Sequence, residues 1–136
     1  MGIDQSVTFA EVSVPTWSAV RDFLTGLGYT VQIRMIDGEL AFPDEEPPEP
    51  WRELRLGAPE GMVTLRRSGG DITFVTWGNA DAGLRQAWNA LTWAFAQVGN
   101  GTVPTATGRI DAAMFRRSAE LPAALQAKAG SDSANR

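Results

Sequence analysis

The chain has 136 residues, a formal net charge of −4 and neither cysteine nor histidine. This length fits one ordinary domain, large enough to bury a hydrophobic core without disulfides or a structural metal. The missing residue types exclude disulfide bonds, Ser-His-Asp and Cys-His catalytic sites, and the usual zinc and iron–sulfur ligand sets. We therefore expect no metal and no cofactor.

The charge balance also bears on the class of partner. Acidic residues outnumber basic ones by 16 to 12, whereas nucleic-acid-binding proteins usually carry a basic excess. We expect no nucleic-acid partner. No run of about 18 apolar residues is present, and the first residues lack the pattern of a signal peptide. The sequence therefore predicts a cytoplasmic protein without a membrane segment. Lys128 is the only lysine, and such a bias toward arginine is typical of GC-rich, bacterial genomes.

A strand and a helix are expected first. Residues 6–14 are rich in β-branched side chains, which favours a strand. A helix should follow, because apolar residues then recur at helical spacing: Trp17, Val20, Leu24 and Leu27.

A hairpin is the clearest local prediction. Asp37-Gly38 lies between alternating segments, and a two-residue type I′ turn needs positive φ at both of its central positions. The turn pairs Ile36 with Glu39 and Met35 with Leu40. Strict alternation would then place four apolar side chains on one face of the hairpin: Ile33, Met35, Leu40 and Phe42.

An acidic, proline-rich loop should follow the hairpin. Residues 43–50 contain four prolines and four carboxylates, which do not fit a helix interior or a central strand. The carboxylates are candidate contacts to a basic partner, and they lack the spacing of a calcium-binding loop. They are Asp44, Glu45, Glu46 and Glu49.

Three strands and a second helix are expected after the loop. Alternation predicts strands over residues 51–56, 62–67 and 72–77. The helix is indicated by an apolar stripe at helical spacing: Leu84, Trp88, Leu91, Phe95 and Val98. Trp93 lies on the opposite face of this helix, so either the C-terminal segment or a partner must cover it.

These elements predict a two-layer α+β domain. Its sheet should have about five to six strands, mostly antiparallel, with two amphipathic helices on one face and a helical C-terminal tail. We expect residues 1–101 to form the domain and residues 102–129 to form a helical extension that packs on the domain or on a partner. The extension should begin with a connector over residues 102–109 and a helix over residues 110–121. Residues 130–136 are expected to be a disordered tail.

No catalytic arrangement is evident among the carboxylates, so we do not expect an enzyme. Three tryptophans without a clear core position are candidate contacts to a partner or ligand, together with the acidic loop: Trp51, Trp77 and Trp93. We expect a small protein-interaction module (an adaptor, an immunity protein or a chaperone-like protein) that binds another protein or itself as a homodimer. The alternative is a small-ligand-binding domain or an unrecognised enzyme, with a Trp- and Arg-lined pocket between sheet and helices. Four strand arginines could hold an anion there: Arg34, Arg52, Arg55 and Arg66.

Overall fold

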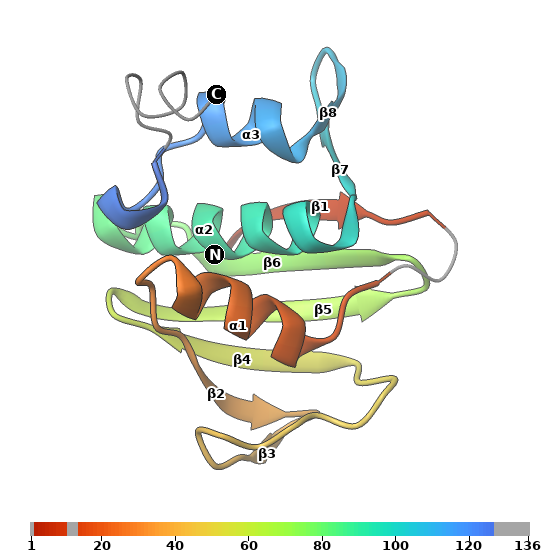
Figure 1. Cartoon of the computed structure of the whole chain (residues 1–136), viewed down its shortest axis with the longest axis vertical. Helices are drawn as coiled ribbons and strands as arrows, with labels where there is room; N and C mark the ends of the chain where they lie inside the picture. Colours follow the sequence, from red (N-terminus) through yellow and green to blue (C-terminus); the bar gives the residue numbers. More distant parts are fainter. Residues whose placement is uncertain (1, 11–13, 127–136) are drawn as a thin grey trace.

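The computed structural model describes residues 2–10 and 14–126. Within them, every pair of neighbouring strands runs antiparallel in a single eight-stranded sheet (Figure 1). The strands in spatial order are β3 (Glu39–Leu40), β2 (Gln32–Ile36), β4 (Glu53–Ala58), β5 (Gly61–Ser68), β6 (Asp71–Trp77), β1 (Gly2–Thr8), β7 (Thr102–Thr105) and β8 (Gly108–Asp111). The α+β class and the antiparallel sheet are confirmed, but the number of strands is higher than predicted.

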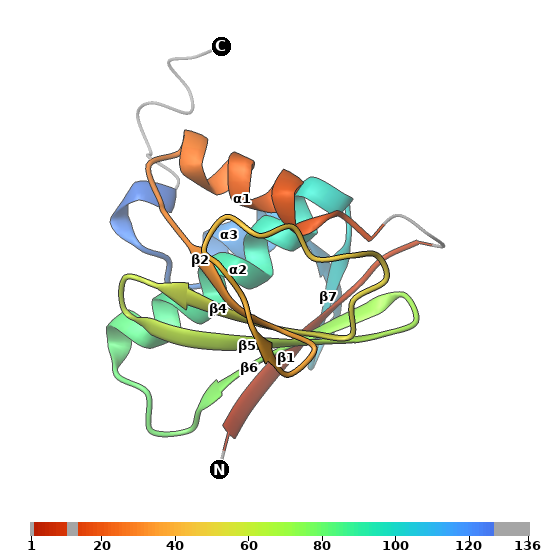
Figure 2. The same cartoon turned by 90° about the horizontal axis from the view of Figure 1, so that it is seen from below.

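In the part of the chain that the structure describes, three α-helices accompany the sheet: α1 (Trp17–Gly26), α2 (Ala82–Gly99) and α3 (Ala112–Ser118). Each begins after a residue whose side-chain oxygen accepts a hydrogen bond from the first turn; these caps are Thr16, Asp81 and Asp111. A short 3₁₀ helix, η1 (Ala123–Leu125), follows α3. Figure 2 shows all three α-helices on the same side of the sheet.

The hydrophobic core lies between α1, α2 and the sheet. Phe95 of α2 links these elements, because its ring centre lies 6.3 Å from that of Trp17 and 5.4 Å from that of Phe74 on β6. Other fully buried side chains of the same core include Leu24, Ile33, Leu54, Leu56, Leu65, Ile72 and Leu91. Burial of these apolar groups is the main favourable contribution to folding.

The predicted hairpin forms with the expected turn. Asp37 and Gly38 both have positive φ, and Met35 pairs with Leu40. The prediction that Ile33 and Met35 share a face is wrong, because the register between β2 and β4 shifts between these two residues. Ile33 pairs with the buried Leu56 and faces the helices, whereas Met35 pairs with the exposed Arg55 on the other face. A β-bulge of this kind adds one residue to one strand.

The two ends of the sheet also differ from the sequence prediction. The first strand spans Gly2–Thr8 rather than residues 6–14, because it pairs along its whole length with β6; residues 11–13 lie outside the described residues. The expected connector over residues 102–109 is instead part of the β7–β8 hairpin, which raises the number of strands to eight. Helix α3 is shorter than the expected helix over residues 110–121. The predicted tail, residues 130–136, lies outside the described residues.

Candidate functional site

One face of the sheet is turned away from the helices (Figure 2). Its side chains follow from the strand registers, because alternate residues of each strand point to the same face. One row runs across six strands: Leu40, Met35, Arg55, Thr64, Val75 and Asp4. The neighbouring rows contribute Gln32, Gly57, Met62, Trp77 and Gly2 on one side, and Glu53, Arg66, Thr73 and Ser6 on the other. We call these three rows the open face.

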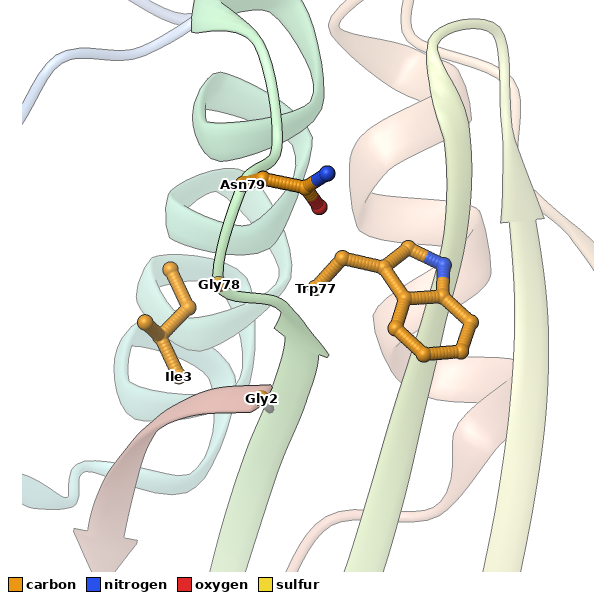
Figure 3. Close-up of a pocket in the computed structure, with 5 residues that line it drawn as sticks. All are labelled: Gly2, Ile3, Trp77, Gly78 and Asn79. Carbon is orange, nitrogen blue, oxygen red and sulfur yellow. The ribbon is translucent and has the colours of Figure 1, made fainter.

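Trp77 is the largest side chain on the open face. It ends β6 and is 65% exposed, and Met62 of β5 is 40% exposed. Figure 3 shows the indole extending from the end of β6 toward β5, away from Ile3. A solvent-accessible indole with a neighbouring thioether is a typical composition for a protein-binding surface.

Two hollows flank the Trp77 side chain. One, of about 620 Å³, is lined by Ile3, Gly78 and Asn79, and Figure 3 shows this side. The other, of about 460 Å³, lies on the open face and is lined by Met62, Thr64, Val75, Arg55 and Arg66. Because Gly2 and Trp77 line both hollows, the two hollows adjoin at the end of β6.

Three arginines lie on the half of the open face nearer to β2. The side chain of Arg34 lies over Gly57, where a Cβ atom would be only 2.8 Å from the Arg34 Nε. Arg66 Nε is 3.2 Å from Oε2 of Glu53, and both side chains are accessible to solvent. Arg34 and Arg55 have no carboxylate within ion-pair distance in the described part of the chain. Unpaired guanidinium groups are therefore available on this surface.

Arg52, the fourth arginine considered from the sequence, is placed apart from these three. It borders a separate hollow together with Asp37 and Gly38 of the hairpin turn. The Asp37 side chain accepts hydrogen bonds from the backbone N–H groups of Arg52 and Glu53, at 2.7 and 2.8 Å. This contact ties the turn to the start of β4.

Trp51 and Trp93 are buried, with 1% and 2% exposure. The guanidinium carbon of Arg67 lies 5.2 Å from the centre of the Trp51 ring. Trp93 packs against Phe23 of α1, with ring centres 5.3 Å apart, and is covered on another side by Arg116 of α3. Of the three candidate tryptophans, Trp77 is the one that a partner can reach in this structure.

The acidic loop is folded onto the chain's own basic groups. Glu46 Oε2 lies 2.7 Å from Arg21 of α1, and Glu49 Oε1 lies 2.8 Å from Arg67. The hydrogen bond to Glu46 raises the pKa of Arg21 above its usual value. Glu45 accepts a hydrogen bond from the backbone N–H of Phe42, and Asp44 is exposed. Through Arg21 the loop is anchored to α1, on the helix side of the sheet, so it does not join Trp77 in one site.

Tyr29 is the remaining titratable group of interest. Its hydroxyl donates a hydrogen bond of 2.8 Å to Oε1 of Glu60. Burial, followed by this bond, raises the pKa of Tyr29 far above its ordinary value of 10.0. The phenol stays protonated at neutral pH, which makes it a poor general base.

Among the described residues, no three His, Cys, Asp or Glu side chains are grouped so that they could hold a metal ion. None of the described helices is long and apolar enough to cross a membrane.

Comparisons of the chain with known protein families, with curated proteins and with solved structures found no match. From the sequence, Trp77 and the three arginines of the open face were recognised as candidate contacts, but Met62 and Val75 were missed. Their alternation with the buried Val63 and Phe74 was the available signal.

Proposed function

We propose that this protein is a small protein-interaction module, without catalytic activity of its own, that binds a protein partner on its open face. The observation that carries the proposal is the 65% exposure of Trp77 on a sheet face that the described helices leave uncovered. Exposed aromatic side chains with adjacent hollows are frequent anchors of protein interfaces. The expected compartment is the bacterial cytoplasm.

An adaptor, an immunity protein and a chaperone-like protein all fit this proposal, since each acts by holding a partner. The alternative is a small-ligand-binding domain, for which a pocket between sheet and helices was expected. The space between sheet and helices is filled by buried side chains such as Trp17 and Phe95, and the arginine-lined hollow is on the open face. The exposed apolar side chains at that hollow, those of Trp77 and Met62, favour a protein partner over a small molecule.

The test is affinity capture from a lysate of the source cells with four matched baits. Met62→Ser and Met114→Ser remove methionines of similar exposure, 40% and 44%, from the open face and from α3 respectively. Wild type and Met114→Ser should retain the same stoichiometric partner, whereas Trp77→Ser and Met62→Ser should lose it. Equal capture by all four folded baits would place the partner elsewhere and contradict the proposal.

A further inference from the structure

We infer that the partner segment held by the open face is acidic, with carboxylates that pair with Arg34 and Arg55 beside an apolar side chain that packs on Trp77. This inference rests on the proposed function and specifies the chemistry of the partner. It follows from the distribution of charged and apolar groups over the open face.

The open face divides into two halves of different chemistry. The apolar half lies over β5 and β6 and consists of Met62, Val75 and Trp77. The basic half lies over β2, β4 and β5 and carries Arg34, Arg55 and Arg66. It is bordered by two apolar side chains, Met35 of β2 and the exposed Leu40 of β3. Both halves meet at the hollow of about 460 Å³, where Arg55 and Arg66 lie on the rim with Met62 and Trp77. No carboxylate lines this hollow in the described part of the chain.

The described part of the chain does not neutralise the basic half. Glu53 is paired with Arg66, and Asp4 lies at the far end of its row, beyond Val75. Elsewhere, Arg21 is paired with Glu46 and Arg67 with Glu49. Other described arginines also have no carboxylate within ion-pair distance, namely Arg52, Arg85, Arg109, Arg116 and Arg117. Within the described residues, Arg34 and Arg55 are thus left without an ion-pair partner in a protein that is acidic overall.

The three arginines of the basic half are spread over successive rows of the open face. Gly57 leaves room for Arg34 to lie along the sheet, beside Met62, which pairs with Gly57. Arg55 and Arg66 occupy the next two rows of the open face, and successive rows along a strand are about 7 Å apart. Guanidinium groups so spaced can each meet a different carboxylate of one segment, and guanidinium–carboxylate pairs are often bidentate.

A nucleic acid is the other polyanion to be weighed against an acidic peptide. The net charge of −4 opposes long-range attraction of a nucleic acid, and a single exposed indole offers one stacking platform rather than a series. An acidic peptide needs only a few local ion pairs and one apolar contact. The observations therefore favour a peptide.

The probes are three short fluorescent peptides that are identical, including one Phe and two Leu, except at three positions occupied by Glu, Gln or Lys. Binding is followed by anisotropy, with the purified full-length protein. We expect the Glu peptide to bind more tightly than the Gln peptide, and the Lys peptide to bind least. Raising the ionic strength from about 0.05 M to about 0.5 M should weaken the Glu peptide selectively.

Variants then locate the binding on the open face. Combining Arg34→Gln with Arg55→Gln should weaken the Glu peptide about threefold to tenfold and leave the Gln peptide unchanged. The matched control is Arg85→Gln, which removes an exposed arginine from α2 without touching the open face. Trp77→Ser should weaken both peptides. In ¹⁵N spectra, the indole signal that Trp77→Phe removes should shift when the Glu peptide is added.

Other results of the binding experiments would overturn the inference in different ways. If the Glu and Gln peptides bind equally and only Trp77→Ser weakens them, the proposed function stands and the inference about charge is overturned. If the Glu peptide does not bind, or binds without dependence on the two arginines, the inference is also overturned. A single-stranded oligo(dT) that binds as tightly and depends on Arg34 and Arg55 would make the partner a nucleic acid. A dimer that Trp77→Ser dissociates would mean that a second copy covers the open face. Either of these last two results overturns the acidic-peptide assignment.

Discussion

The guanidinium carbon of Arg116, on α3, lies 4.8 Å from the centre of the Trp93 ring on α2. The same side chain donates a hydrogen bond of 3.0 Å to the backbone carbonyl of Leu125 in η1. One arginine therefore joins α2, α3 and η1, and it helps to cover the tryptophan that lies off the apolar stripe of its own helix.

Replacing Arg116 should destabilise the protein. Arg116→Ala removes a cation–π contact and a hydrogen bond, so we expect the free energy of unfolding to fall by about 1–2 kcal/mol. The measurement is urea unfolding followed by tryptophan fluorescence. Arg117→Ala is the matched control, because Arg117 is the exposed neighbour on the same helix, and it should change the free energy by less than about 0.5 kcal/mol. Equal effects of the two changes would show that the contact at Trp93 contributes nothing.

Replacing each of two glycines at helix ends by alanine should change the stability of the protein in opposite directions. A Cβ atom at Gly99, the last residue of α2, would lie 2.5 Å from Phe9 and 2.6 Å from Pro15, so Gly99→Ala should cost about 1–3 kcal/mol of stability. Nothing lies within 4 Å of the corresponding position at Gly26, the last residue of α1. Gly26→Ala should therefore raise stability by up to about 1 kcal/mol. Thermal unfolding of both variants tests the packing of α2 against Phe9 and Pro15. An equal loss of stability in both variants would contradict the predicted difference.

The pKa of Tyr29 predicts a loss of stability at alkaline pH. In the unfolded chain the phenol ionises near pH 10.0, whereas burial and Glu60 raise its pKa in the folded protein. The stabilisation is therefore fully present below pH 10.0 and declines as the pH rises above that value. Tyr29→Phe should remove this decline, after a loss of about 1 kcal/mol at neutral pH from the missing hydrogen bond.

Tyr29 is the only tyrosine in the chain, so absorbance at the phenolate wavelength follows this residue alone. In the folded protein the phenolate signal should be absent just above pH 10.0 and should develop together with unfolding. A normal titration curve in a protein that is still folded would disprove the buried environment of this hydroxyl.

Collisional quenching should distinguish Trp77 from the buried indoles. Trp17, Trp51 and Trp93 are at most 2% exposed, and the Trp88 N–H donates to the carbonyl of Phe74 at 2.7 Å. Acrylamide should therefore act mainly on Trp77, and Trp77→Phe should lower the quenching constant substantially while the fold is retained. If the constant is unchanged, the Trp77 indole is covered in solution, by a second copy or by a part of the chain that the structure does not describe.

Local chemistry explains which parts of the fold the sequence predicts correctly. The turn at Asp37-Gly38 and the pairing of Met35 with Leu40 depend on residues that are close in the chain, and both are confirmed. The stripe of α2 is likewise a local property. The bulge beside Arg34 is not a local property, because it lies in the pairing of β2 with β4, a strand outside the hairpin. The alternation of residues 29–42 therefore does not predict it.

The same distinction applies to the candidate site. Trp77 could be recognised from the sequence because β6 alternates apolar groups on both faces. The burial of Trp51 and Trp93 could not be recognised from the sequence, because the residues that cover them, Arg67 and Arg116, are distant in the chain. The β7–β8 hairpin was missed for a related reason. Its strands have four residues each and contain Pro104 and Gly108, so pairing beside β1 rather than intrinsic propensity keeps them in the sheet.

The position of β1 inside the sheet affects the order of folding. This strand is synthesised before α1, yet Gly2 pairs with Trp77 and Thr8 pairs with Thr102. Its neighbours on both sides therefore emerge from the ribosome much later than β1 itself. The hairpins from β2 to β6 can assemble by local contacts, whereas the insertion of β1 must close a long loop, which slows folding. A nascent chain stalled before β6 would hold an unpaired strand, and such strands are prone to aggregate.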